Sequence, residues 1–532
     1  MKKTIVSCIT FFAYTYVNAQ EAYQESLDQR INDGFKNATD WFVDAIFEEI
    51  PITSEVGIPW VLVVLLLGAS YFTIYFKGIN IRSFLTSIRI VRGKYDDLEE
   101  SDTLEVSENV HTTEGDLPDT IRIEGGDGEV SHFQALTAAL SATVGLGNVA
   151  GVAIALSIGG PGATFWMILV GFLGMASKFV ECTLGVAYRE IDEHGTVYGG
   201  PMYYLSKGLK ERGFGGLGKV LAIIFAIMCV GGSFGGGNMF QANQAFKLFE
   251  HVTGAENSFI HEKGWLFGLI MAIFVAIVII GGIKKIAKVT DKIVPSMVVV
   301  YVVAVITVIT INYKIIPEAI LAIVDGAFSA EGISGGIVGV MIQGFRRAAF
   351  SNEAGIGSAS IAHAAVKTKY AASEGLVALL EPFIDTVVIC TMTAMVLIIT
   401  GQIEVGAQIS DEQGVLLTAS ALESGISWFP YVLSVAVILF AFSSMISWSY
   451  YGYQAWSYLF GREKYVAYIY KTIFCICVII GSAASLTAVT DFSDAMIFSM
   501  LVPNMIGLFI MAPRVAKELK KYREAISKNT FL

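Results

Sequence analysis

Two long apolar stretches of this chain are interrupted by short, glycine-rich polar segments. The first segment is ATVGLGN (142–148), inside the apolar run 133–156, and the second is FSNEAGIGS (350–358), inside the run 336–366. Backbone at membrane depth must satisfy its own hydrogen bonds, so a helix breaks there only within protein or beside a water-filled cavity. A break leaves free N–H groups, which suit anions, and free carbonyls, which suit cations. The two segments therefore predict a substrate and ion site near mid-membrane.

The first segment predicts how backbone groups could bind a small anion and a cation. Glycine at Gly145 and Gly147 permits conformations denied to other residues and lets a ligand approach closely. Asn148 either caps the break or donates a hydrogen bond to a ligand. The amides expected to bind a carboxylate are those of Gly145, Leu146 and Gly147. The carbonyls that can face a cation are those of Ser141, Thr143 and Val144.

The second segment places a carboxylate at membrane depth. Such a group is costly there, so Glu353, close to Ser351, is a candidate functional residue. The alternative is a structural role for Glu353, with Arg346, Arg347 or free backbone amides as its partners. Phe350, at the edge of the segment, is either a lid over the substrate or an ordinary core aromatic residue.

Two more polar pairs lie within apolar runs. Asn238 and Gln241 are three residues apart and share a helix face, so they either hold helices together or read a polar group of the substrate. The adjacent hydroxyls of Ser443 and Ser444 are hard oxygen ligands suited to an alkali cation, although serine also hydrogen-bonds to its own helix.

The remaining sequence features favour a membrane protein over an enzyme. With 54% hydrophobic and 16% charged residues and a mean hydropathy of +0.61, the composition is that of a membrane protein. Three other carboxylates, Glu181, Glu381 and Asp385, are interpreted as half-buried pairing groups. The sequence contains no nucleophile–base arrangement, zinc-ligand spacing or phosphate loop, so neither catalysis nor an organic cofactor is expected. It also has no basic, aromatic-interleaved patch for nucleic acid.

The hydropathy pattern predicts an all-α membrane protein with about eleven transmembrane helices, each near the roughly 20 residues that a bilayer requires. Residues 1–19 have the two lysines, the short apolar core and the small-residue end of a cleavable signal peptide. The expected spans follow it: 57–76, 133–158, 162–187, 219–247, 264–283, 292–313, 336–366, 375–400, 428–457, 466–487 and 492–512.

Loops rich in lysine and arginine alternate along the chain with loops that are acidic or neutral. Lysine and arginine gather in the loops 77–94, 189–212, 284–288, 367–369, 462–464 and 514–521. The loops of the opposite side are acidic or neutral: 20–56, 159–162, 248–263 and 401–427. Because cytoplasmic loops retain positive charge, the N-terminus is predicted outside and the C-terminus in the cytoplasm, across a bacterial inner membrane.

Ten helices follow from the first broken span onward, and the broken ones are the first and the sixth. An odd number of spans per half inverts the second half, so the pattern predicts a five-plus-five inverted repeat around a midplane site. The expected parts are a signal peptide (1–19), an extracytoplasmic segment (20–56), an extra helix (57–77), an acidic cytoplasmic loop (78–131), two repeats (132–313 and 314–512) and a cytoplasmic tail (513–532). Within the loop, residues 95–130 are expected to form a solvated, flexible insert.

Six runs of residues also match a known pattern: FQALTAALSATVGLGNVAGVA (133–153), GGPGATFWM (159–167), GNMFQAN (237–243), FRRAAFSNEAGIGSASIAHAA (345–365), LEPFIDTVVICT (380–391) and FAFSSMISWSYYG (440–452). They resemble the alanine/glycine:cation symporter family of the amino acid–polyamine–organocation superfamily. The resemblance implies a LeuT-like inverted-repeat fold. It also implies uptake of small neutral amino acids, chiefly alanine and glycine, coupled to Na⁺ entry by alternating access. Proton coupling is the alternative, and a cation channel with Glu353 as filter is a further one.

The resemblance also implies a set of site residues. For the substrate these are Thr143, Gly145, Leu146, Gly147 and Gln241, with Phe350 as lid and with Ser351 and Glu353 of the second segment. For Na⁺ they are the carbonyls of Ser141, Val144 and Phe440 and the hydroxyls of Ser443 and Ser444. The family usually has threonine where this chain has Leu146, so a hydroxyl is missing there and substrate choice can differ. The expected partners are a small neutral amino acid, Na⁺ and the lipid bilayer.

Overall fold

The computed structural model of the chain describes residues 27–51, 57–99, 128–193, 195–280, 282–328, 336–403 and 414–529. The signal peptide expected at 1–19 lies outside these residues, and so does the part 100–127 of the acidic loop. The described ends of that loop are ordered, because residues 96–99 form a short helix and Val130 forms a parallel bridge with Val366. The flexible character predicted for this loop therefore does not extend to either end.

The first part of the chain forms helices joined by two small β-hairpins. Strand β1 pairs with β2, and β3 with β4, both antiparallel. The elements are α2 (Leu27–Ile46), β1 (Glu49–Pro51), β2 (Gly57–Pro59), α3 (Trp60–Tyr75), α4 (Ile79–Arg82), α5 (Phe84–Val91), α6 (Asp96–Glu99), α7 (His132–Thr143), η2 (Gly147–Gly151), α8 (Val152–Gly159), α9 (Ala163–Ala187), β3 (Glu190–Ile191), β4 (Val197–Tyr198), α10 (Pro201–Tyr203), η3 (Tyr204–Gly208), α11 (Leu209–Glu211), α12 (Gly215–Phe234), η4 (Gly235–Met239) and α13 (Phe240–Val252).

The second part is helical throughout its described residues. Its elements are η5 (Ala255–Asn257), α14 (Gly264–Ile279), α15 (Gly282–Ile311), η6 (Tyr313–Ile315), α16 (Ile316–Phe328), α17 (Gly336–Asn352), α18 (Ala359–His363), α19 (Ala371–Ala378), α20 (Leu380–Pro382), η7 (Phe383–Cys390), α21 (Thr391–Ile399), α22 (Val415–Glu423), α23 (Phe429–Phe460), α24 (Lys464–Ala483) and α25 (Leu486–Asn529). Across the two parts, the described residues include four π-helical turns, η2, η3, η4 and η7, and each continues into an α-helix.

Among the described residues, seven helices are long and apolar enough to cross a membrane, and the bent pair of α7 with η2–α8 makes an eighth. Each of the eleven predicted spans contains a helix. The count of eleven is nevertheless not confirmed, because α3 and α14 have only 16 residues and α17 has 17. The outward faces explain the apolar composition, since α14 exposes Ile270, Ile273, Phe274 and Ile277 where a soluble helix would be polar.

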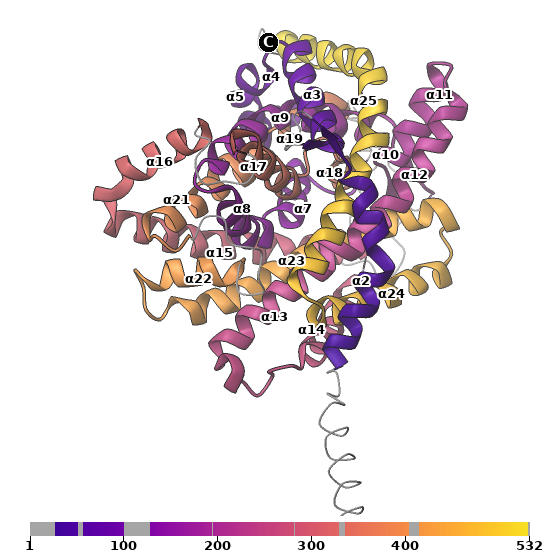
Figure 1. Cartoon of the computed structure of the whole chain (residues 1–532). Helices are drawn as coiled ribbons and strands as arrows, with labels where there is room; N and C mark the ends of the chain where they lie inside the picture. Colours follow the sequence, from indigo (N-terminus) through magenta and orange to yellow (C-terminus); the bar gives the residue numbers. More distant parts are fainter. Residues whose placement is uncertain are drawn as a thin grey trace, which may run out of the picture.

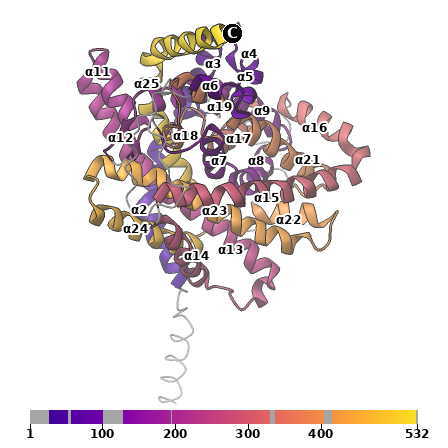
Figure 2. The ribbon, with the colours of Figure 1, turned by 180° about the vertical axis from the view of Figure 1, so that it is seen from behind.

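The broken helices lie in the middle of the molecule. In both views α7, α8, α17 and α18 occupy the centre, while α14, α16 and α24 lie at the periphery (Figure 1, Figure 2). A break at this place is enclosed by protein, which is the condition under which backbone can leave the helical path at membrane depth.

The N-terminal helix α2 is packed onto the helical core rather than standing apart from it. It runs along α25 (Figure 1), where the ring of Phe35 lies 5.1 Å from that of Phe492. Beyond the end of α2, Phe47 contacts Phe498 at 5.7 Å. The backbone N–H of Ser485 donates to Asn32 Oδ1 at 3.0 Å. The N-terminal segment therefore covers one end of α25.

Candidate functional site

The first break separates α7 from η2 and bends the two halves by 51°. Neither Gly145 nor Gly147 adopts a positive φ, so the prediction that they are needed for unusual backbone conformations is wrong. Space is the reason at Gly145, since a Cβ there would lie 2.6 Å from Ser444 Oγ. The glycine brings the break directly against α23.

The amides of the first break donate to side-chain oxygens in this structure. Gly145 N–H donates to Asn148 Oδ1 at 2.9 Å, and Leu146 N–H donates to Gln241 Oε1 at 3.3 Å. Asn148 therefore caps the break, as one of its two predicted roles requires. A substrate carboxylate would have to replace these two acceptors. Gln241 thus reaches the site, whereas Asn238 donates to Phe474 O at 2.7 Å and holds η4 to α24.

The serines expected to hold a cation meet at the end of α7. Ser444 Oγ donates to Ser141 O at 3.1 Å, and Ser141 Oγ donates to Ser443 O at 3.2 Å. Ser443 Oγ donates to the carbonyl of Phe440 at 2.9 Å, within its own helix. Three of the five expected ligands are thus in mutual contact, a fourth, Phe440, touches them, and Val144 follows at the end of α7. Thr143 is different, because its hydroxyl donates to Ala139 O of its own helix.

The second break, between α17 and α18, has the strained backbone that the first break lacks. Glu353, Gly355 and Gly357 have φ values of 54°, 84° and 98°. A Cβ on Gly355 would lie 2.2 Å from Met505 Cε, so this glycine is needed for both conformation and space. Asn504 Nδ2 donates to Gly355 O at 2.8 Å and fixes the break to α25.

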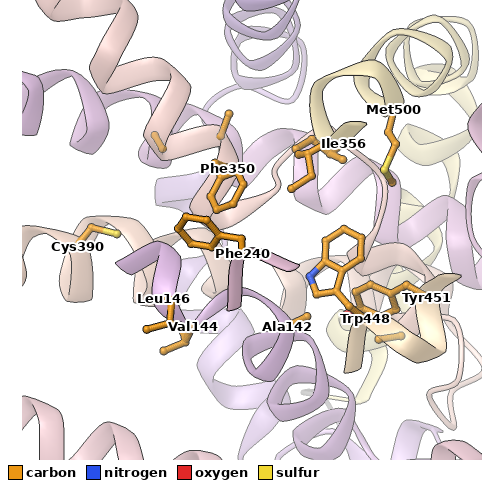
Figure 3. Packing of buried hydrophobic residues seen from close by; sticks show 14 of the residues in the cluster. Ala142, Val144, Leu146, Phe240, Phe350, Ile356, Cys390, Trp448, Tyr451 and Met500 are labelled. Carbon is orange, nitrogen blue, oxygen red and sulfur yellow. The ribbon is translucent and has the colours of Figure 1, made fainter. Parts of the chain in front are cut away.

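Phe350 lies where the two breaks meet. Figure 3 shows its ring beside that of Phe240, near Leu146 and Val144 of the first break. The two rings are 5.1 Å apart in an edge-on arrangement. A Cβ on Gly147 would lie 3.5 Å from Ser351 Cα and 3.7 Å from Phe350 Cδ1. Asn148 Nδ2 donates to Ser351 Oγ at 3.2 Å, so the two breaks are in direct contact. Phe350 is buried and packed, and its position covers the first break from the side of α17.

The two arginines that were alternative partners of Glu353 pair with α25 instead. Arg346 contacts Asp494 at 2.6 Å and Asp491 at 3.2 Å, and Arg347 also contacts Asp494. The guanidinium of Arg347 lies 5.2 Å from the centre of the Phe350 ring. The arginine alternative for Glu353 is therefore wrong.

Asp385 links the two breaks to η7. Its carboxylate accepts hydrogen bonds from Asn148 Nδ2 at 2.7 Å, Ser351 Oγ at 2.7 Å and Thr386 Oγ1 at 2.8 Å. It is fully buried, as are Glu181 and Glu381, so the expected half-buried position of these three residues is wrong. The expected pairing is confirmed for Glu181 and Glu381, which both pair with Lys178. The rule that flagged Glu353, a carboxylate within an apolar span, would have identified Asp385 as well.

A set of buried charged groups, here called the inner charge cluster, lies behind the second break. Lys178 Nζ is 3.0 Å from Glu381 and 3.8 Å from Glu181. His363 joins Glu374 at 2.5 Å to Glu381 at 3.5 Å. Glu374 also contacts the imidazole of a second histidine at the start of α7. The cluster comprises Lys178, Glu181, Glu374, Glu381, His132 and His363. Sequence reasoning named only its two glutamates at 181 and 381, because the others are far apart in the chain.

Comparison with known proteins identifies the relatives of this chain. The sequence model of the sodium:alanine symporter family matches residues 42–531. The sodium/alanine symporter AgcS of Methanococcus maripaludis is 40% identical over 407 residues, which cover 76% of this chain and 87% of AgcS. The probable sodium/glutamine symporter GlnT of Bacillus subtilis is 34% identical, over 74% of this chain and 78% of GlnT.

A solved structure shares the fold. The crystal structure of MhsT in complex with L-phenylalanine superposes with a TM-score of 0.53 and 15% sequence identity, over 72% of this chain and 89% of MhsT. At this identity the likeness concerns the fold alone. It confirms the predicted class, an all-α membrane protein with a LeuT-like core. The repeat boundaries at 132–313 and 314–512 stay predictions.

Proposed function

The chain belongs to the sodium:alanine symporter family, and from this premise we propose that it takes up small neutral amino acids, chiefly alanine and glycine, together with Na⁺ by alternating access. It is a sodium-coupled amino acid transporter of the membrane, not an enzyme. The observation that carries the finer proposal is the contact between the first break and the serines of α23, because it brings anion-binding amides and cation-binding oxygens together.

The substrate carboxylate binds at the first break in this proposal. It accepts from the amides of Gly145, Leu146 and Gly147 after displacing the side-chain oxygens of Asn148 and Gln241. Room for the substrate side chain is small, since the aromatic rings at 240 and 350 are packed against this break. This packing supports a preference for alanine and glycine over larger amino acids such as the glutamine in the name of GlnT.

Further residues surround the proposed substrate position. Ser351 lies against Gly147, and Phe350 covers the proposed substrate position as a lid. Leu146 is fully buried at the centre of the break, so the side chain that replaces the usual threonine of the family contributes only apolar contact. Thr143 stays in the proposal as a residue that would turn its hydroxyl from Ala139 to the ligand.

The co-transported Na⁺ binds where α7 meets α23. Its ligands are the carbonyls of Ser141, Val144 and Phe440 and the hydroxyls of Ser443 and Ser444, oxygens of the kind that unwound helices offer to alkali ions. A cation there joins the inner half of the first break to α23. It thereby stabilises the arrangement that binds the carboxylate, which is what coupling requires.

Orientation and location are part of the same proposal. The distribution of lysine and arginine supports a bacterial inner membrane with the N-terminus outside and the C-terminus in the cytoplasm. Breaks that lead each predicted repeat, at α7–η2 and α17–α18, support the five-plus-five arrangement around the site.

Uptake by proteoliposomes tests the proposal directly. Radiolabelled alanine, glycine, serine and glutamine are compared in Na⁺ and in choline buffer. We expect Na⁺-dependent uptake of alanine and glycine, less of serine and least of glutamine. Uptake that follows a pH gradient equally well in choline would favour proton coupling alone. Ion current without any amino acid would favour a channel. Either result would overturn the proposed coupling.

Replacing one hydroxyl tests the cation position. Ser444→Ala removes one oxygen ligand, and hydrogen bonds to charged groups are worth about 1.5–3 kcal/mol. We expect the Na⁺ concentration for half-maximal alanine uptake to rise about tenfold or more. The matched control is Ser449→Ala on the same helix, whose hydroxyl donates only to Ile446 O at 2.6 Å in the structure. Unchanged Na⁺ dependence of Ser444→Ala would contradict the assignment of Ser444 as a ligand of Na⁺.

A further inference from the structure

The carboxyl group of Glu353 is buried in the second break with a single neutral partner. The residue is 2% exposed and has a left-handed backbone, with φ at 54°. The hydroxyl of Ser358 donates to its Oε2. An ionised carboxylate in such a place normally needs a cation or several hydrogen-bond donors.

The basic side chains around Glu353 are already paired with other acids. Arg346 and Arg347, on the helix that leads to it, contact the aspartates of α25. Lys178 Nζ lies 3.0 Å from Glu381 and 3.8 Å from Glu181, and its effect on Glu353 is only that of a more distant charge.

A count of charges shows that these buried groups cannot all be ionised. Glu353 and the inner charge cluster contain four carboxyl groups, at 181, 353, 374 and 381, and one lysine. Even with both histidines of the cluster protonated, one carboxylate remains uncompensated. Because an uncompensated charge in a protein interior is strongly unfavourable, at least one of the four carries a proton.

The three other carboxylates of the cluster each lie at ion-pair distance from a basic side chain, which Glu353 does not among the described residues. Glu374 contacts two imidazoles, and Glu381 contacts both Lys178 and His363. Glu181 has Lys178 and the Nδ2 of Asn504 at 3.3 Å. Asp385 of η7 accepts three hydrogen bonds. Glu353, with one hydroxyl, is the group on which the required proton is held most favourably.

The surroundings of Glu353 on its remaining sides add no positive charge. Cys229 of α12 and Tyr451 of α23 lie within electrostatic range and are neutral when protonated. Asp385 of η7 and Glu381 of α20 are acids, and both disfavour a second negative charge. On these sides the charges therefore favour the neutral form of Glu353, and only the more distant Lys178 opposes them.

We propose that Glu353 carries an exchangeable proton that is released when the second break opens and is transported together with the amino acid. When the second break opens, the carboxyl group of Glu353 gives its proton to a water molecule, and Glu353 is left ionised and hydrated.

Asn504 of α25 ties this proton site to the transport cycle. It bonds both Gly355 of the second break and Glu181 of the inner charge cluster. Separation of α25 from the break would remove this link and open the site to water, in which an ionised Glu353 is stable. The inference rests on the proposed function for its direction of transport, but the buried proton itself does not depend on it.

Infrared difference spectroscopy of the purified protein tests the proton without requiring transport. We expect a carbonyl-stretch band of a protonated carboxylic acid that disappears in alkaline buffer. The band should be lost in Glu353→Gln and retained, shifted, in Glu353→Asp. A band that persists unchanged in Glu353→Gln would overturn the proposal, and so would a wild-type spectrum without one. The wild type and Glu353→Asp keep the test decisive if the glutamine variant does not fold.

Transport assays then test movement of the proton. With a pH-sensitive dye inside proteoliposomes, alanine should acidify the lumen of wild-type vesicles. This acidification should be lost in Glu353→Gln and retained in Glu353→Asp, which keeps the carboxyl group. Glu250→Gln, a carboxylate paired with His261 away from the cluster, is the control and should behave as wild type.

The two proposals fail in different ways. Acidification that survives in Glu353→Gln would overturn the proton site while leaving Na⁺-coupled uptake intact. Wild-type vesicles without Na⁺-dependent alanine uptake would overturn the proposed function, whereas the infrared band would still decide whether Glu353 holds a proton.

Discussion

The two breaks leave the helical path for different physical reasons. At the first break no glycine has a positive φ, and Gly145 is required because α23 approaches it closely. At the second break Glu353, Gly355 and Gly357 are all left-handed, and the chain is held in that shape by contacts with α25. The first break is thus a closely packed opening of the helix, and the second is a fixed turn. The sequence pattern G-x-G is therefore present in both breaks, although the glycines are needed for different reasons.

The breaks also differ in charge. The amides and hydroxyls of the first break are neutral, and each is bonded to a neighbour that a ligand could replace. The second break lies between two sets of ionised groups, the arginine–aspartate pairs at α25 and the inner charge cluster. Exchangeable neutral partners suit a binding site, whereas buried ion pairs suit a fixed framework. Variants in each break separate these two roles.

The largest expected effect is on the charged flank of the second break. Arg347→Met leaves Asp494 with only Arg346, and removing one partner of a buried ion pair costs about 3–5 kcal/mol. Ser141→Ala in the first break removes neutral hydrogen bonds worth about 0.5–1.5 kcal/mol each. Thermal unfolding in detergent measures both. Equal losses would show that the charged flank has no special structural role, and Asp494→Asn added to Arg347→Met should restore part of the loss.

The next effect concerns glycine conformation. Gly357→Ala introduces a Cβ 2.7 Å from Pro201 Cγ at a φ of 98°, and such a strained residue costs roughly 1–3 kcal/mol before the clash is counted. Gly147→Ala places its Cβ at an ordinary 3.5 Å from the nearest atom, so its stability should stay close to that of wild type. A Gly147→Ala protein that unfolds as early as Gly357→Ala would contradict the distinction between the two breaks.

A smaller change in stability, but a clear one in transport, is expected at Gly145. The Cβ of Gly145→Ala would lie 2.6 Å from Ser444 Oγ and 3.3 Å from Gln241 Oε1, so Ser444 must turn away from Ser141. We expect about 1 kcal/mol of destabilisation, the size of one hydrogen bond, and a raised Na⁺ requirement for alanine uptake. Retained wild-type Na⁺ dependence would show that Ser444 does not contact the ion.

The smallest effect is expected outside both breaks, at Glu190 in β3. Burial alone would raise its pKa, but the side chains of Lys207 and Arg462 hold the pKa of Glu190 below its ordinary 4.5. The ion pairs therefore stabilise the fold above about pH 4.5, and this contribution is lost as the pH falls through the lowered pKa. Since these side chains are 38–41% exposed, Glu190→Gln should cost only about 0.2–1 kcal/mol at neutral pH. The free energy of unfolding of the wild type and of Glu190→Gln, measured as a function of pH, tests this prediction.

The sequence was sufficient to place the breaks, because glycine and polar residues within apolar runs have few structural explanations at membrane depth. It also brought Gln241, Ser443 and Ser444 to the site through the family resemblance. It could not distinguish a glycine needed for space from one needed for φ, since both appear as the same letter. The inner charge cluster was missed because Lys178, His363 and Glu374 lie on three helices, and only the packing of those helices brings them together.

The three hydrogen bonds of Asp385 make the two breaks mechanically dependent on each other. Their donors come from η2, α17 and η7. If one break moved alone, the buried carboxylate of Asp385 would therefore lose part of its hydrogen bonds. Rearrangement is consequently cooperative, with few stable intermediates in which only one half-helix has moved. In hydrogen-exchange experiments, the amides of residues 144–147 and 353–358 should then open as one unit and at one rate.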